Sequence, residues 1–140
     1  MVIKRDLSDE AITTFGLLFS DYGFQVSSQH TSEEFGNAFV IAESEDFSLR
    51  FILDRGISSV EIGIASNPCE WFDLNIVRSF ILGADLLEAA GPDVSAEFLK
   101  THYAKVKELM GDERVAATIN EFRKLEHERA RRMFPQAFEK

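Results

Sequence analysis

Apolar residues near the start of the chain recur at intervals of three and four positions, the spacing of one face of an α-helix. This pattern predicts a single amphipathic helix over residues 7–22. Ser8 is a favourable N-cap, and Gly23 follows the last periodic residue, where helices commonly end through a left-handed residue. The predicted apolar face consists of Ala11, Ile12, Phe15, Leu18, Phe19 and Tyr22.

From residue 24 to residue 65 the apolar positions follow a period close to two, which predicts β-strands. The segments between these strands are too short for the crossover that parallel neighbours require. We therefore expect an antiparallel meander. Its four strands are a polar one at residues 24–29 and more apolar ones at 38–43, 47–54 and 57–65.

The register of the last hairpin follows from its apolar positions. A one-residue slip would move every side chain of a strand to the other face, so the register must keep the apolar residues of both strands on one face. Phe51 should therefore pair with Val60, which leaves residues 55–56 as the loop. This register places Arg50 opposite Glu61, a favourable cross-strand charge pair. The alternative is a bulge next to the loop, because arginine is unfavourable in the left-handed first position of a tight turn.

The remainder of the chain is predicted to be helical. Asn67 is a favourable N-cap with Pro68 in the first helical position, and Gly83 follows the last apolar position of this helix. The predicted apolar face of the helix begins at Trp71. Residues 85–90 predict a short helical turn.

Two longer helices should follow. Asp93 or Ser95 is the predicted N-cap of a helix that continues to about Met110, and Gly111 separates it from a last helix at 112–134. The predicted fold class is therefore α+β, with an N-terminal helix, a four-stranded antiparallel meander, and three to four C-terminal helices packed on one face.

Composition limits the class of protein. The chain has 140 residues, is 45% hydrophobic and contains 13 Phe, which fits a single globular domain over residues 1–140. No apolar run is long enough to cross a bilayer. One cysteine excludes an internal disulfide, and the first ten residues lack the apolar core of a signal peptide, so a cytoplasmic location is expected.

The charge is unevenly distributed. The net charge of −9 argues against nucleic acid as a partner. Residues 1–99 carry 5 basic and 17 acidic side chains, whereas residues 100–140 carry 10 basic and 7 acidic ones. We expect the acidic part to form a surface that contacts a partner, unless the basic helices pack beside it and neutralise it. The candidate contact residues are Glu43, Glu45, Asp46, Asp54 and Glu61.

Catalytic and metal-binding patterns are absent from the sequence. His30, His102 and His127 do not have the spacing of metal ligands, and no glycine-rich nucleotide motif occurs. Cys69 falls in the first turn of a predicted helix, which would lower the pKa of its thiol, but no neighbouring residue in sequence supplies a base. We therefore predict no catalytic residue, cofactor or metal.

Two segments resemble a known group of proteins. They are FGNAFVIAESEDFSLRFILDRG at residues 35–56 and EWFDL at residues 70–74. Together they resemble small bacterial proteins of uncharacterised or immunity type, some of which are encoded as partners of polymorphic toxins. The resemblance implies a cytoplasmic, non-enzymatic protein that occludes a toxin domain.

Three functional hypotheses follow. The leading one is a non-enzymatic acidic binding protein whose partner is another protein, such as a basic toxin domain, and not nucleic acid or a membrane. The second is a small-molecule-binding or regulatory domain with a pocket between the sheet and the helices. The third is an enzyme that uses Cys69 or a pair of carboxylates. The sequence leaves the oligomeric state open.

Overall fold

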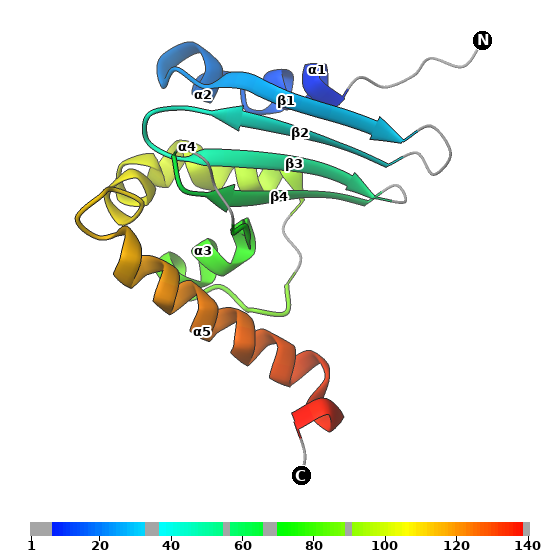
Figure 1. Cartoon of the computed structure of the whole chain (residues 1–140), viewed down its shortest axis with the longest axis vertical. Helices are drawn as coiled ribbons and strands as arrows, with labels where there is room; N and C mark the ends of the chain where they lie inside the picture. The colour runs from blue at the N-terminus through cyan, green and yellow to red at the C-terminus, as the bar shows by residue number, and fades with distance from the viewer. Residues whose placement is uncertain (1–6, 33–36, 55–56, 66–69, 89–90, 139–140) are drawn as a thin grey trace.

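The computed structural model describes residues 7–32, 37–54, 57–65, 70–88 and 91–138 (Figure 1). These residues form an α+β fold in which one antiparallel sheet, with strand order β1-β2-β3-β4-β5, packs against helices from both ends of the chain. The elements are α1 (Leu7–Thr14), α2 (Gly16–Asp21), β1 (Gln25–Ser32), β2 (Asn37–Glu43), β3 (Ser48–Asp54), β4 (Ile57–Gly63), β5 (Phe72–Asp73), α3 (Leu74–Leu82), α4 (Pro92–Leu109), α5 (Val115–Met133) and the 3₁₀ turn η1 (Pro135–Phe138).

The predicted meander and the register of its last hairpin are confirmed. Phe51 pairs with Val60, and the pairing of β3 with β4 continues without a shift to Asp54 and Ile57. The predicted loop at residues 55–56 lies outside the described residues. Arg50 stands opposite Glu61, and its Nε donates a hydrogen bond to Glu61 Oε1 at 2.7 Å.

The prediction of one N-terminal helix over residues 7–22 is wrong in one respect, because the helix is interrupted at Phe15. The backbone of Phe15 has φ −108° and ψ 29°, and its ring packs edge-on against Phe51 of β3, with centroids 4.8 Å apart. Gly16, a poor helix former, follows directly. Burial of the Phe15 ring against the sheet therefore replaces an unbroken helix by two short ones.

The ends of this helical segment differ in how well they were predicted. The predicted exit is confirmed, because Gly23 has φ +73° and the Phe24 N–H donates to the Leu18 carbonyl at 3.2 Å. The predicted N-cap is wrong, because α1 already includes Leu7, so Ser8 lies inside the helix and not at its cap.

The sheet has five strands and not four, because the segment before α3 is extended. The predicted helix start at Asn67 lies outside the described residues, but Phe72 and Asp73 pair with β4 as β5. Helix α3 begins only at Leu74, where the Asp73 side chain accepts a hydrogen bond from the Asn75 N–H at 2.8 Å. Trp71 is therefore not part of a helix.

Smaller differences affect other element ends. Strand β1 extends to Ser32, and residues 85–88 form a turn closed by a hydrogen bond from the Glu88 N–H to the Asp85 carbonyl, not a helix. Helix α4 begins at Pro92 with Gly91 as its N-cap, and neither Asp93 nor Ser95 caps it. Helix α5 begins at Val115, three residues later than predicted.

The core lies between the helices and one face of the sheet. Alternate strand residues on this face are buried, α1 contacts β2 and β3, and α3 and α4 contact β4. Helix α5 packs on α3, with the Phe122 ring 5.4 Å from Phe72 and 5.8 Å from Phe80. Figure 1 shows α4 crossing behind the sheet, and no described helix covers the opposite face. The buried apolar strand residues on this face are Val40, Ala42, Leu49, Phe51, Val60, Ile62 and Phe72.

Replacing Gly83 by alanine should lower the free energy of unfolding by about 1–2 kcal/mol. Gly83 ends α3 with φ +72°, and an added Cβ would meet no atom within 4 Å, so the cost comes from the backbone alone. Gly16→Ala is the matched control, since Gly16 has equally open space without a left-handed φ and lies in a helix. Urea unfolding should show Gly16→Ala unchanged or more stable. Equal losses in both variants would contradict the left-handed requirement at Gly83.

Candidate functional site

The face of the sheet opposite the helices forms a surface that we call the outer face. One row across it consists of His30, Phe39, Ile52 and Ser59, which pair in succession from β1 to β4. A second row consists of Ser28, Ile41, Arg50, Glu61 and Asp73, which pair in succession from β1 to β5. Because side chains alternate along each strand, Glu43 and Asp54 lie on the same face.

The centre of the outer face is apolar. Phe39, Ile41 and Ile52 are only half-buried, although they belong to inner strands of the sheet. The imidazole of His30 stacks on the Phe39 ring, with the centroids 5.4 Å apart. A hollow of about 410 Å³ opens here, and its lining includes His30, Phe39, Ile52 and Asp54. The described part of the chain thus leaves apolar side chains in contact with solvent at the middle of the outer face.

Arg50 is held in a fixed position beside this apolar centre. Its guanidinium bonds to the Glu61 carboxylate, and its central carbon lies 4.8 Å from the centre of the Trp71 ring. Charge-assisted hydrogen bonds and cation–π contacts both favour one orientation of the guanidinium. Glu61, one of the predicted contact residues, is therefore paired within the molecule.

Helix α5 places basic residues along the β5 edge of the outer face. Arg123 donates to both carboxylate oxygens of Glu70 at 3.1 and 3.0 Å, and this hydrogen bonding lowers the pKa of Glu70 below its usual value. Arg129 lies 3.5 Å from Asp73. At this edge a basic helix therefore neutralises acidic side chains, as the alternative interpretation of the charge distribution expected.

Glu126 is the one group in this edge cluster whose pKa is raised. Burial is the main cause, and the negative charges of Glu70, Glu61 and Asp73 add to it, while the charge of Arg129 opposes it. The carboxylate of Glu126 is thus held among other carboxylates on the side of α5 that faces the sheet edge.

The five predicted contact residues do not form one patch. Glu43, Asp54 and Glu61 share the outer face, but Asp54 ends β3 at the opposite end of the sheet from the β2–β3 turn. Glu45 is exposed in that turn. Asp46 turns toward α4 instead, where it accepts a hydrogen bond from Tyr103 Oη at 2.5 Å and lies 3.7 Å from Lys107 Nζ.

Tyr103 was not singled out in the sequence as more than a core residue. Its ring stacks on Tyr22, with centroids 3.7 Å apart, and burial together with the hydrogen bond to Asp46 raises the pKa of its phenol above the usual value. The phenol therefore remains a hydrogen-bond donor throughout the physiological pH range. It fixes the β2–β3 turn to the helical layer.

The apolar residues of the outer face were also missed, because the sequence argument followed charge. A signal for them exists, since residues 38–42 are apolar at every position and do not alternate with polar ones. One face of a strand can pack against the helices, so such a run leaves apolar side chains on the other face as well.

The residues considered for catalysis are placed as follows. Cys69 lies outside the described residues. His30, His102 and His127 belong to β1, α4 and α5, and His102 lies beside the ring of Phe98 at 5.3 Å. Across the described ranges, no three His, Cys, Asp or Glu side chains come together in a way that could hold a metal ion. No described helix has the length and apolar character needed to span a membrane.

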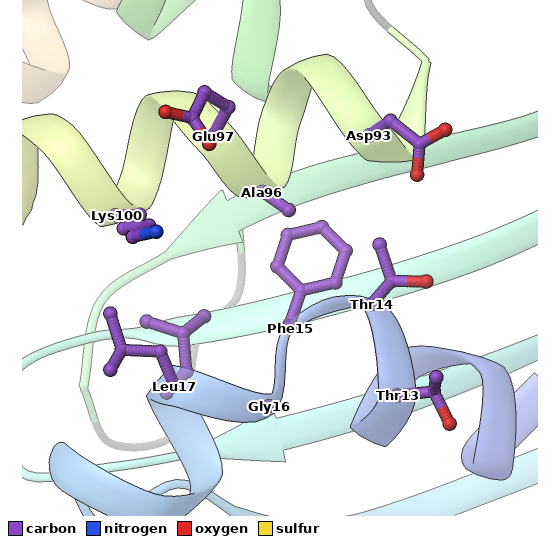
Figure 2. Close-up of a pocket in the computed structure, with 10 residues that line it drawn as sticks. Thr13, Thr14, Phe15, Gly16, Leu17, Asp93, Ala96, Glu97 and Lys100 are labelled. Atoms are coloured by element: carbon purple, nitrogen blue, oxygen red, sulfur yellow. The ribbon is translucent and has the colours of Figure 1, made fainter.

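A second hollow, of about 460 Å³, lies on the helical side of the molecule (Figure 2). Its lining comes from α1, the break at Phe15, α2 and the first half of α4. It is thus situated between helices, whereas the small-molecule hypothesis expected a pocket between the sheet and the helices.

Removing the Tyr103 hydroxyl should lower the free energy of unfolding by about 1–2 kcal/mol, because it removes a hydrogen bond to a charged carboxylate. Tyr103→Phe retains the ring and its stacking. Tyr22→Phe is the matched control, because Tyr22 is exposed at the other side of the same ring stack, and it should change stability by less than about 0.5 kcal/mol. Chemical denaturation measures both, and equal effects would contradict a role for the Tyr103–Asp46 bond.

Glu126→Gln should raise the melting temperature at pH 7. Glu126 has a pKa in the folded protein that is raised above its ordinary value of 4.5, so the folded state binds the proton more tightly than the unfolded state. The folded state therefore loses stability as the pH rises from 4.5 to the raised pKa. The difference between variant and parent should therefore shrink as the pH falls toward about 4.5 and be absent below it. Glu121→Gln, which removes a carboxylate paired with Lys124 on the same helix, should not raise the melting temperature. A constant difference from pH 4 to pH 7 would exclude titration of Glu126 as its cause.

Comparison with known proteins adds no precedent for either hollow. No family model matches the chain, and neither a curated protein nor a solved structure shows significant similarity to it. The functional argument therefore depends on the geometry of the outer face and of the helical side.

Proposed function

We propose that this protein is a non-enzymatic binding protein that holds a basic protein partner on its outer face. The observation that carries the proposal is the combination of half-buried Phe39, Ile41 and Ile52 with surrounding carboxylates on a sheet face that no described helix covers. Exposed apolar patches bordered by polar groups are typical of protein interaction sites.

The composition of the outer face supports a protein partner. Interfaces are enriched in aromatic residues and arginine at their centres and carry charged groups at the rim. Here Phe39, Ile52 and Arg50 line the central hollow, and the Trp71 ring lies against the Arg50 guanidinium. Because Arg50 is already oriented by Glu61, little side-chain entropy remains to be lost when a partner packs against it.

The charge of the outer face supports a basic partner. Glu43, Asp54, Glu61 and Asp73 place four carboxylates on this face, where Arg50 bonds to Glu61 and Arg129 lies 3.5 Å from Asp73. Complementary potential of this kind speeds encounter and disfavours acidic partners more than it adds to affinity. A basic toxin domain, the partner implied by the sequence resemblance, has the required chemistry, and a broad sheet face could cover its active site.

Site-specific photo-cross-linking in the native host tests the location of the interface. A photo-reactive phenylalanine analogue at position 39 should cross-link one basic protein. The same analogue at position 105, an exposed site on the outward side of α4, should not cross-link it. Cross-linking of the same protein from both positions, or of an acidic protein from position 39, would overturn the proposal.

Charge reversal then tests the electrostatic part with the recovered partner. Glu43→Lys combined with Asp54→Lys should slow association about tenfold at low salt while changing dissociation much less, because the rim steers encounter. The parent rate should also fall as salt rises from about 10 to 150 mM, where the screening length shortens from ~30 to ~8 Å. Glu97→Lys on α4 is the control for a single charge reversal away from the outer face, to be compared with Glu43→Lys alone, and should leave the rate within about twofold. An association rate that changes neither with salt nor with the double reversal would show that these carboxylates are not part of the interface.

A further inference from the structure

The hollow on the helical side exists because the N-terminal helix is broken. Phe15 turns its ring into the core against Phe51, and Gly16 follows it without a side chain. A Cβ added at Gly16 would meet no atom within 4 Å, and Gly16 does not have the left-handed φ that requires glycine. Neither packing nor backbone geometry therefore requires glycine at this position. The absence of a side chain at Gly16 leaves the groove between α2 and α4 open.

The two ends of the groove carry opposite charges. Asp93 and Thr14 lie at one end, and Lys100 and Leu17 lie at the other (Figure 2). Asp93 and Lys100 are seven residues apart on one side of α4, which corresponds to about 10 Å at 1.5 Å per residue. Among the described residues, neither side chain takes part in an ion pair, although both are exposed.

The middle of the groove combines apolar groups with one carboxylate, that of Glu97 on α4. Ala96 of α4 lies above the Phe15 ring, between the two charged ends (Figure 2). Thr13 and Thr14 add hydroxyl groups to the wall formed by α1. A ligand that fits this arrangement has a cation and an anion about 10 Å apart, small apolar groups between them, and amides that can bond to hydroxyls.

We propose that this groove binds a short peptide of about three residues with a free amino group and a free carboxylate. An extended chain spans about 3.3–3.6 Å per residue, so three residues match the separation of Asp93 and Lys100. The ammonium end pairs with Asp93, the carboxylate end pairs with Lys100, and small side chains contact Phe15 and Ala96. The volume of about 460 Å³ lies in the range of small-ligand pockets.

This site is independent of the proposed protein-binding function. The groove lies between helices that pack on the buried face of the sheet, whereas the partner is assigned to the opposite, outer face. The Glu43→Lys and Asp54→Lys reversal should therefore leave peptide binding unchanged. Loss of either function would not imply loss of the other.

Titration of the full chain with tri-alanine, followed by amide NMR spectra, tests the proposal. The Gly16 N–H signal should shift with a dissociation constant of about 1 mM, the affinity expected for a ligand of this size. N-acetylated and C-amidated tri-alanine, which each lack one charge, should bind about three- to fivefold more weakly. Absence of a saturable Gly16 shift at about ten times that concentration, or equal binding of all three peptides, would overturn the proposal.

Variants separate the groove from other sites on the surface. Gly16→Leu should fill the groove and abolish the saturable shift of the Ala96 N–H signal without lowering the melting temperature, because its side chain enters open space. Lys100→Met should weaken tri-alanine about three- to fivefold and remove the preference for the free carboxylate. Lys105→Met, on α4 but outside the groove, is the matched control and should bind like the parent. Binding that survives Gly16→Leu, or that falls equally in Lys105→Met, would overturn the site.

Discussion

Burial of alternate side chains along β2, β3 and β4 assigns one face of the sheet to the helices, and most other features of the molecule depend on this assignment. Leu49, Phe51 and Ile62 are each less than 5% exposed, and they are contacted from a layer that includes α1, α3 and α4. Once that face is occupied, the side chains between them must point to the other face. The outer face is therefore a consequence of how the core is built, and its mixture of apolar and charged residues is a property of the same strands.

The charge asymmetry of the chain is only partly retained in three dimensions. Helix α5 places Arg123 and Arg129 against Glu70 and Asp73, and Lys107 of α4 lies near Asp46, so acidic residues at the β5 edge and in the β2–β3 turn have basic neighbours. Such exposed pairs contribute little to stability, but they change where negative potential remains. Glu43 and Asp54 of the outer face belong to β2 and β3 and lie away from the β5 edge along which α5 packs.

The break at Phe15 has a similar double consequence. The Phe15 ring packs edge-on against Phe51 from the residue at which the helix is interrupted. Interrupting the helix buries the ring and also opens the groove in which Asp93 and Lys100 face a ligand of opposite polarity. Packing of the Phe15 ring against the sheet thus leaves two separate surfaces, the outer face of the sheet and the groove between the helices. These surfaces can bind different molecules.

The α+β class, the antiparallel meander, the β3–β4 register and the glycine exits of two helices followed from the sequence, because these features depend on local periodicity, turn length and backbone conformation. The break at Phe15 and strand β5 did not, because Phe15 and Phe72 take their conformations from contacts with strands distant in sequence. The same limit applies to the sites. Glu43, Asp54 and Glu61 could be named as surface carboxylates, but the pairing of Asp46 with Tyr103 spans 57 positions. Only the tertiary structure could decide which charges are neutralised, since neutralisation depends on which helix packs beside each carboxylate.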